Sequence, residues 1–149
     1  MKMDWDFCKM HLGKGHLIIF APQFGDTALY FSFRTVDGSD IDMSKFGDTI
    51  NSCYDTIKEM VDDGKVVDWI MNDKAEYHEI DNIILTHFTK NYVSFSGDDL
   101  ITFNKHKDII WNARVHFREL EAKENRFSYR LKRKLMLLKR RFSFSKSKH

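Results

Sequence analysis

The last third of this chain lacks both residues that most often interrupt a helix. All 52 residues after Gly97 are free of glycine and proline, and the whole chain has one proline, Pro22. Because glycine and proline cost a helix interior the most free energy, a long segment without them favours a helix. Apolar residues recur there at spacings of three and four, the period of one helix face. The pattern predicts a helix from about Lys105, with Asn104 as its N-cap, to Phe142.

Two apolar stripes follow this predicted helix, separated by the polar patch Glu121–Arg126. The first stripe is short and is suited to packing on the rest of the chain. We expect the second stripe to dock the helix on a partner or on the protein's own body. The first stripe consists of Ile110, Ala113, Phe117 and Leu120, and the second of Phe127, Leu131, Leu135, Leu138 and Phe142.

Positive charge is concentrated in the same segment. Residues 123–149 contain 11 of the 24 Lys and Arg residues but only one acidic residue, Glu124, which gives a formal charge of +10 and leaves −8 on residues 1–122. Such a division attracts polyanions to one end of a chain. The residues that we expect to bind the partner are Arg126, Arg130, Lys132, Arg133, Lys134, Lys139, Arg140 and Arg141.

Like charges at this density repel one another, so an opposing surface must offset the repulsion. Four such surfaces are possible: the acidic body of the same chain, a nucleic acid, an acidic groove on a partner protein and an anionic membrane surface. The segment lacks tryptophan, which disfavours the membrane. The sequence leaves the choice among the other three open.

Residues 1–122 are expected to form one compact α+β domain, and residues 123–149 a basic helical extension with a polar tail. Alternation of apolar and polar residues predicts strands at 17–20 and 28–36. A helical period predicts an amphipathic helix at 48–63, capped by Asp48 and ended by Gly64. Its Cys53 lies on the apolar face and is expected to be buried.

The rest of the domain is harder to interpret. Residues 66–71 suit either a strand or a helical turn, and the polar residues 72–81 suggest a loop. Three short apolar runs, at 83–88, 92–96 and 100–103, predict strands of an antiparallel meander. The predicted fold is α+β: a small antiparallel sheet packed by one amphipathic helix, plus a long basic C-terminal helix. The N-terminal segment is expected to be an irregular arm or helix that packs through Trp5 and Phe7.

The composition and the N-terminal sequence indicate the cellular compartment of the protein. Two cysteines, Cys8 and Cys53, do not make a disulfide framework, and the N-terminus has no apolar signal region. The apolar runs are too short to span a bilayer. These features predict a cytoplasmic protein without a transmembrane segment, and the composition is typical of viral or phage accessory proteins.

Signatures of catalysis and of metal binding are weak. His87-Phe88-Thr89 matches half of the paired H-x-T pattern of two-histidine phosphoesterases, but no second such element exists. Cys8, His11 and His16 have a loosely zinc-like spacing without a fourth ligand. We therefore expect no cofactor, no metal and no catalytic residue.

The sequence predicts a non-enzymatic binding module that uses its basic C-terminal helix to bind a polyanion, most simply nucleic acid. The first alternative is an assembly subunit that docks through the apolar stripe into a homo-oligomer or a larger particle. The second alternative is a small phosphodiesterase or nuclease that uses His87.

Overall fold

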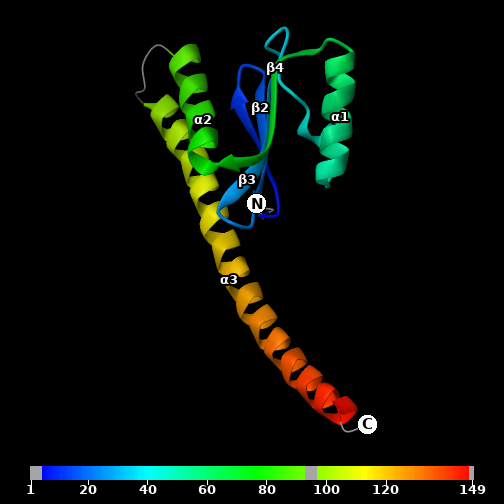
Figure 1. The fold of residues 1–149 in the computed structure, drawn as a ribbon. Coiled ribbons are helices and arrows are strands. Elements are labelled where there is room, and N and C mark those ends of the chain that lie inside the picture. Colours follow the sequence, from blue (N-terminus) through cyan, green and yellow to red (C-terminus); the bar gives the residue numbers. More distant parts are fainter. Residues whose placement is uncertain (1–4, 93–96, 148–149) are drawn as a thin grey trace. The chain divides into compact units, whose positions relative to one another are not determined.

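The computed structural model describes residues 5–92 and 97–147 (Figure 1) and separates the chain into two compact units, Met1–Phe117 and Arg118–His149. The fold is α+β, as predicted: a four-stranded antiparallel sheet accompanied by three α-helices. The sheet, helices α1 and α2 and the beginning of α3 belong to the first unit. The predicted domain boundary after Ala122 lies a few residues beyond the division between the units.

The sheet is a simple meander. Its strands β1 (Cys8–Gly13), β2 (His16–Gln23), β3 (Thr27–Thr35) and β4 (Val66–Glu76) are neighbours in chain order, and each pair is antiparallel. The turn between β1 and β2 requires glycine at position 15, where φ is +75° and an added Cβ would lie 2.1 Å from Oγ1 of Thr35.

Both faces of the central strands are buried. Alternate residues of β2 point to opposite faces, and each face contributes to its own core. In Figure 1, α1 (Ile50–Asp62) lies on one side of the sheet and α2 (Tyr77–Asn91) on the other. The core beneath α1 includes Leu17, Ile19, Phe31, Phe33, Phe46, Cys53 and Ile57, and the opposite core includes Ile18, Phe20, Tyr30, Ile80, Ile84, Phe88, Ile110 and Ala113.

The helix predicted at 48–63 is present as α1, but its N-cap is Thr49 and not Asp48. The Thr49 hydroxyl accepts a hydrogen bond from the Ser52 backbone N–H at 3.1 Å. In return, Oγ of Ser52 accepts a hydrogen bond from the Thr49 backbone N–H. This capping box satisfies two backbone donors of the first turn. Cys53 is fully buried, as predicted, and burial raises the pKa of its thiol.

The predicted strand at 83–88 is wrong, because these residues belong to α2. Buried Ile80, Ile84, His87 and Phe88 recur at a helical spacing of four, three and one, so they form one face against the sheet. The predicted strand at 100–103 is also wrong and lies in α3 (Asp98–Ser147). Of the predicted strand at 92–96, Tyr92 is the C-cap of α2 and residues 93–96 lie outside the described part of the chain.

One strand replaces a segment that was predicted otherwise, and another decides between two alternatives. The N-terminal segment, expected to be an irregular arm or helix, contains β1, in which Cys8, Met10 and Leu12 are buried in alternation. Residues 66–71, which suit either a strand or a helical turn, form the beginning of β4. Because β4 continues through Glu76 and residues 77–81 belong to α2, the loop predicted at 72–81 is wrong. Pairing with β3 holds this polar stretch extended, because the ladder satisfies its backbone groups whatever the side chains are.

The long C-terminal helix is present as α3, and it begins at Asp98, before the predicted start at Lys105. Asp98 and Asp99 occupy its first turn, where carboxylates are stabilised by the helix dipole. Asn104 therefore lies inside the helix and is not its cap. Ile110 and Ala113 of the first apolar stripe are buried in the core.

Candidate functional site

The basic segment of α3 presents exposed cations in the part of it whose side chains the structure describes. Arg126, Arg130 and Lys134 are exposed, and among the described residues none of them forms an ion pair with a carboxylate. Within the described part of the chain, Nε of Arg126 donates to the backbone oxygen of Ala122, at 3.4 Å. The positive charge of these three side chains is therefore not neutralised by described carboxylates.

An exposed apolar row runs beside these cations. Phe127, Leu131 and Leu135 are 68%, 47% and 52% exposed. They follow the three cations by one position, so the apolar row and the cationic row lie about 100° apart around the helix axis. The remaining predicted residues lie outside the described side chains: Lys132, Arg133, Leu138, Lys139, Arg140, Arg141 and Phe142.

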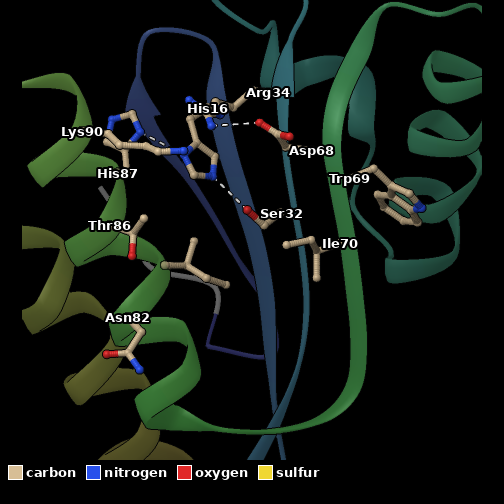
Figure 2. Close-up of a pocket in the computed structure, with 11 residues that line it drawn as sticks. His16, Ser32, Arg34, Asp68, Trp69, Ile70, Asn82, Thr86, His87 and Lys90 are labelled. Atoms are coloured by element: carbon tan, nitrogen blue, oxygen red, sulfur yellow. Dashed lines mark hydrogen bonds and ion pairs between the residues drawn. The ribbon is translucent and has the colours of Figure 1, made fainter.

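A second candidate site is a pocket between α2 and the sheet, which the sequence did not predict (Figure 2). Its volume is about 450 Å³, within the range of sites for small molecules. Strands β2, β3 and β4 line one side and α2 lines the other. The residues that line it include His16, Ser32, Arg34, Asp68, Ile70, Ile83, Thr86, His87 and Lys90.

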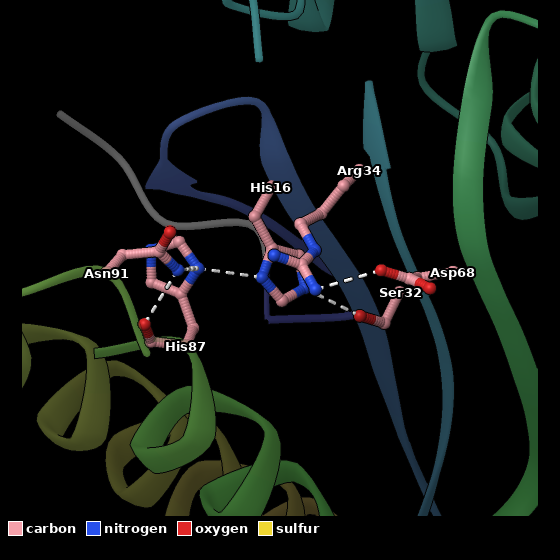
Figure 3. Close-up of polar contacts among 6 residues, drawn as sticks. All are labelled: His16, Ser32, Arg34, Asp68, His87 and Asn91. Atoms are coloured by element: carbon pink, nitrogen blue, oxygen red, sulfur yellow. Dashed lines mark hydrogen bonds and ion pairs between the residues drawn. The ribbon is translucent and has the colours of Figure 1, made fainter. Parts of the chain in front are cut away.

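Two histidines from distant parts of the chain meet in this pocket (Figure 3). Nδ1 of His16 on β2 lies 2.9 Å from Nδ1 of His87 on α2, and both rings are buried, with 8% and 3% exposed. Nε2 of His16 lies 2.8 Å from Oγ of Ser32 on β3. Asn91 donates through Nδ2 to the backbone oxygen of His87 at 2.8 Å, and the same nitrogen lies 3.3 Å from Nδ1 of His87.

The Asn91 amide favours one assignment of the tautomers of the two rings. With its N–H directed at Nδ1 of His87, that nitrogen is assigned as an acceptor, and Nδ1 of His16 as the donor to His87. In this assignment Nε2 of His16 accepts a hydrogen bond from the Ser32 hydroxyl. Nε2 of His87 is buried without a hydrogen-bond partner in the described structure.

Both rings are neutral at physiological pH. Burial lowers the pKa of His16 to about 3, and the adjacent His87 and Arg34 act in the same direction. Burial also lowers the pKa of His87 to about 4, while the nearby Leu12 backbone acts in the opposite direction. Loss of hydration penalises an imidazolium more than a neutral ring, which accounts for both directions.

The low basicity of the two rings weighs against a role as general bases. A general base is most effective when its pKa lies near the working pH, and a ring with a pKa of about 3 holds a proton from serine poorly. His87 lies within α2, and Thr89 instead donates to the Leu85 carbonyl of the same helix, at 3.0 Å. The His87 and Thr89 side chains therefore have different hydrogen-bond partners.

An Arg–Asp pair stands at the edge of the same pocket. Nη2 of Arg34 donates to Oδ2 of Asp68 at 2.8 Å. Ser32 pairs with Ile70 whereas Arg34 pairs with Val67, so β4 carries one extra residue here, and Asp68 has a φ of +56°. Such a bulge redirects a side chain, and here it accompanies the pairing of Asp68 with Arg34.

Cys8, His11 and His16 do not converge. Cys8 belongs to the core beneath α2, whereas His11 pairs in register with Leu17 of the opposite core. Across residues 5–92 and 97–147, no group of three or more His, Cys, Asp or Glu side chains is placed to hold a metal ion.

The sequence points to His87 but not to its partner. His16 groups in the sequence with Cys8 and His11, and nothing local indicates a contact across 71 positions. The signal that was available is the position of His87 on the buried face of a helix, where a polar ring needs a hydrogen-bond partner.

Among the described residues, no helix combines the length and apolarity needed to cross a bilayer. Comparison with protein-family models, with curated proteins and with solved structures found no match to this chain.

Proposed function

We propose that the basic segment of α3 binds nucleic acid, with its arginines and lysines contacting phosphates. The observation that carries the proposal is the exposed row Arg126, Arg130 and Lys134, which has no described carboxylate partner in a segment of charge +10. Phosphates would neutralise this row and release counterions, which is the dominant source of sequence-independent affinity for nucleic acids.

The adjacent apolar row supports the same function. The Phe127 ring is the most exposed of its row and lies next to Arg126 in sequence. Aromatic rings between cations provide surfaces on which unpaired bases stack, and such stacking tolerates any sequence. We infer binding that is strong at low salt and weakly selective for sequence, by a protein of the cytoplasm.

The test is a titration of a fluorescent 20-nucleotide single strand and of the corresponding duplex with the full chain at several salt concentrations. We expect the logarithm of the affinity to fall linearly with the logarithm of the salt concentration, with a slope of about −0.7 to −0.9 per phosphate contact. The triple variant Arg126→Gln, Arg130→Gln, Lys134→Gln should make this slope shallower by about 2 to 3.

The matched control removes three exposed lysines from the first unit, Lys58→Gln, Lys74→Gln and Lys105→Gln. It makes the same change in net charge and should leave the slope nearly unchanged. A flat salt dependence of the wild-type protein, or an equal loss in the control, would overturn the proposal.

The exposed apolar row favours a second candidate, an assembly subunit that docks through this face. In that case Leu131→Glu would abolish a concentration-dependent oligomer in sedimentation experiments, whereas the cationic triple variant would not.

The phosphodiesterase hypothesis for His87 predicts turnover of a generic phosphodiester that His87→Ala removes. The low basicity of the paired rings weighs against this hypothesis.

A further inference from the structure

We propose that the pocket between α2 and the sheet is a binding site for a small organic anion. The acidic group of the ligand, a carboxylate or a phosphate, would bind to Arg34 and Lys90, and its apolar body would pack on Ile70 and Ile83. This site lies wholly in the first unit and is independent of the nucleic-acid site proposed for α3.

The pocket has the size and lining that such a ligand needs. Its volume is about 450 Å³, and it combines aliphatic side chains with a few polar groups from four different elements. Pockets of this kind, with convergent polar groups on an apolar lining, are the usual binding sites of small molecules. The two aliphatic walls, Ile70 on β4 and Ile83 on α2, come from opposite sides of the pocket.

The charges of the pocket select an anion. Arg34 and Lys90 are cations, and Asp68 is the one carboxylate among the described lining residues, which therefore have a formal charge of +1 when both histidines are neutral. Lys90 forms no ion pair within the described part of the chain. An acidic ligand would supply its missing partner.

Arg34 is held in place but not saturated. A guanidinium has five N–H donors, and the structure shows one of them donating to Asp68. The bulge at Asp68 therefore orients the guanidinium while leaving donors for a ligand. A positive φ at a non-glycine residue is uncommon and costs free energy, which is typical of positions where local geometry serves a site.

The histidine pair forms a neutral polar wall. The hydrogen bonds among Ser32, His16, His87 and Asn91 occupy most of the polar atoms of this wall. The wall can therefore contact the body of a ligand without requiring a counter-charge. The two imidazole rings also make ligand binding observable by NMR, because their resonances would shift when a molecule binds beside them.

The test is an NMR titration of the full chain with four probes of similar size: phenyl phosphate, benzoate, benzyl alcohol and benzylamine. We expect one or both anions to shift the imidazole resonances of His16 and His87 and to bind at least ten-fold more tightly than the alcohol or the amine. Comparison of the two anions identifies whether the site prefers phosphate or carboxylate.

Three variants locate the binding. Lys90→Gln should weaken the preferred anion at least ten-fold, and Lys74→Gln, an exposed lysine outside the pocket, should not. Thr86→Trp adds an indole at an exposed position of α2 that lines the pocket, so it should block binding while the protein remains folded. A dispersed amide spectrum checks the fold of each variant.

Three results would overturn the proposal. The first is an equal affinity for the anionic and the neutral probes. The second is an anion affinity that Lys90→Gln and Thr86→Trp leave unchanged. The third is the absence of pocket shifts with every probe up to about 10 mM, since ligands of this size reach the millimolar range when they fit a formed pocket.

Discussion

The hydroxyl of Ser32 satisfies a buried imidazole nitrogen that has no other partner among the described residues. It donates to Nε2 of His16 at 2.8 Å, and both residues are buried. Ser32→Ala leaves this acceptor unsatisfied, so we predict that the free energy of unfolding falls by about 1–3 kcal/mol. Urea titration measures the change.

The control variant is Thr89→Ala, which removes an exposed hydroxyl whose hydrogen bonds in the described structure lie within its own helix. It should change the free energy of unfolding by less than about 0.5 kcal/mol. Equal losses in the two variants would contradict the prediction.

The two histidines also make stability depend on pH. Their folded-state pKa values of about 3 and about 4 lie below the ordinary value of 6.5, so between these limits the unfolded chain binds more protons. The free energy of unfolding is therefore highest above pH 6.5 and falls as the pH is lowered, by up to about 1.4 kcal/mol per pH unit for each proton. We predict a lower urea midpoint at pH 5.5 than at pH 7.5.

The variant His16→Gln removes one of these titrating rings and should make the pH dependence shallower. The exposed His78, which is paired with Glu76 at 3.0 Å, provides the comparison. His78→Gln should leave the slope close to that of the wild-type protein. A midpoint independent of pH across this window would contradict the assignment of buried neutral rings.

At the scale of elements, the start of α1 depends on one hydroxyl. Thr49 caps the helix whereas Asp48 precedes it, so the two neighbours differ in role. We predict that Thr49→Ala lowers the free energy of unfolding by about 1 kcal/mol, since the capping bond to the Ser52 N–H is lost. Asp48→Ala should cost less than about 0.5 kcal/mol. Chemical denaturation followed by circular dichroism distinguishes them, and the reverse order would restore Asp48 as the cap.

The sequence predicts elements with one clear period and fails where two periods fit. In α1 the apolar residues match only a helix, and the prediction is confirmed. In Ile83–Phe88 a short apolar run fits both a strand and a helix, and only the packing of Ile80, Ile84 and Phe88 against the sheet decides between them. Strand β1 did show a readable alternation of Cys8, Met10 and Leu12, which the scattered charges obscured.

The candidate pocket was less predictable than the fold. Its two histidines are 71 positions apart, and they meet because α2 returns along the face of the sheet that carries His16. The bulge that places Asp68 depends on a shift in pairing between β3 and β4, which no local pattern specifies. The charge of α3, in contrast, follows from composition alone.

At the scale of the whole molecule, both cores are complete before α3 enters the second unit. Among the described residues, the last member of either core is Ala113, and the first unit ends at Phe117. We predict that a chain of residues 1–117 folds with the urea midpoint of the full chain, because it retains every core residue. Tryptophan fluorescence follows the transition, since Trp5, Trp69 and Trp111 all lie within residues 1–117. A large fall in the midpoint would show instead that residues 118–149 stabilise the first unit.

The two cores also have different histories during synthesis. The core beneath α1 needs only residues up to β4, whereas the opposite core needs Ile110 and Ala113. At about 5–20 residues per second, roughly 2–7 s separate the emergence of Glu76 from that of Ala113. If the sheet forms during this interval, Ile18, Phe20 and Tyr30 are covered in two steps, first by α2 and then by the start of α3. We expect this face of the nascent sheet to be most accessible to chaperones after β4 emerges and before α2 packs on it.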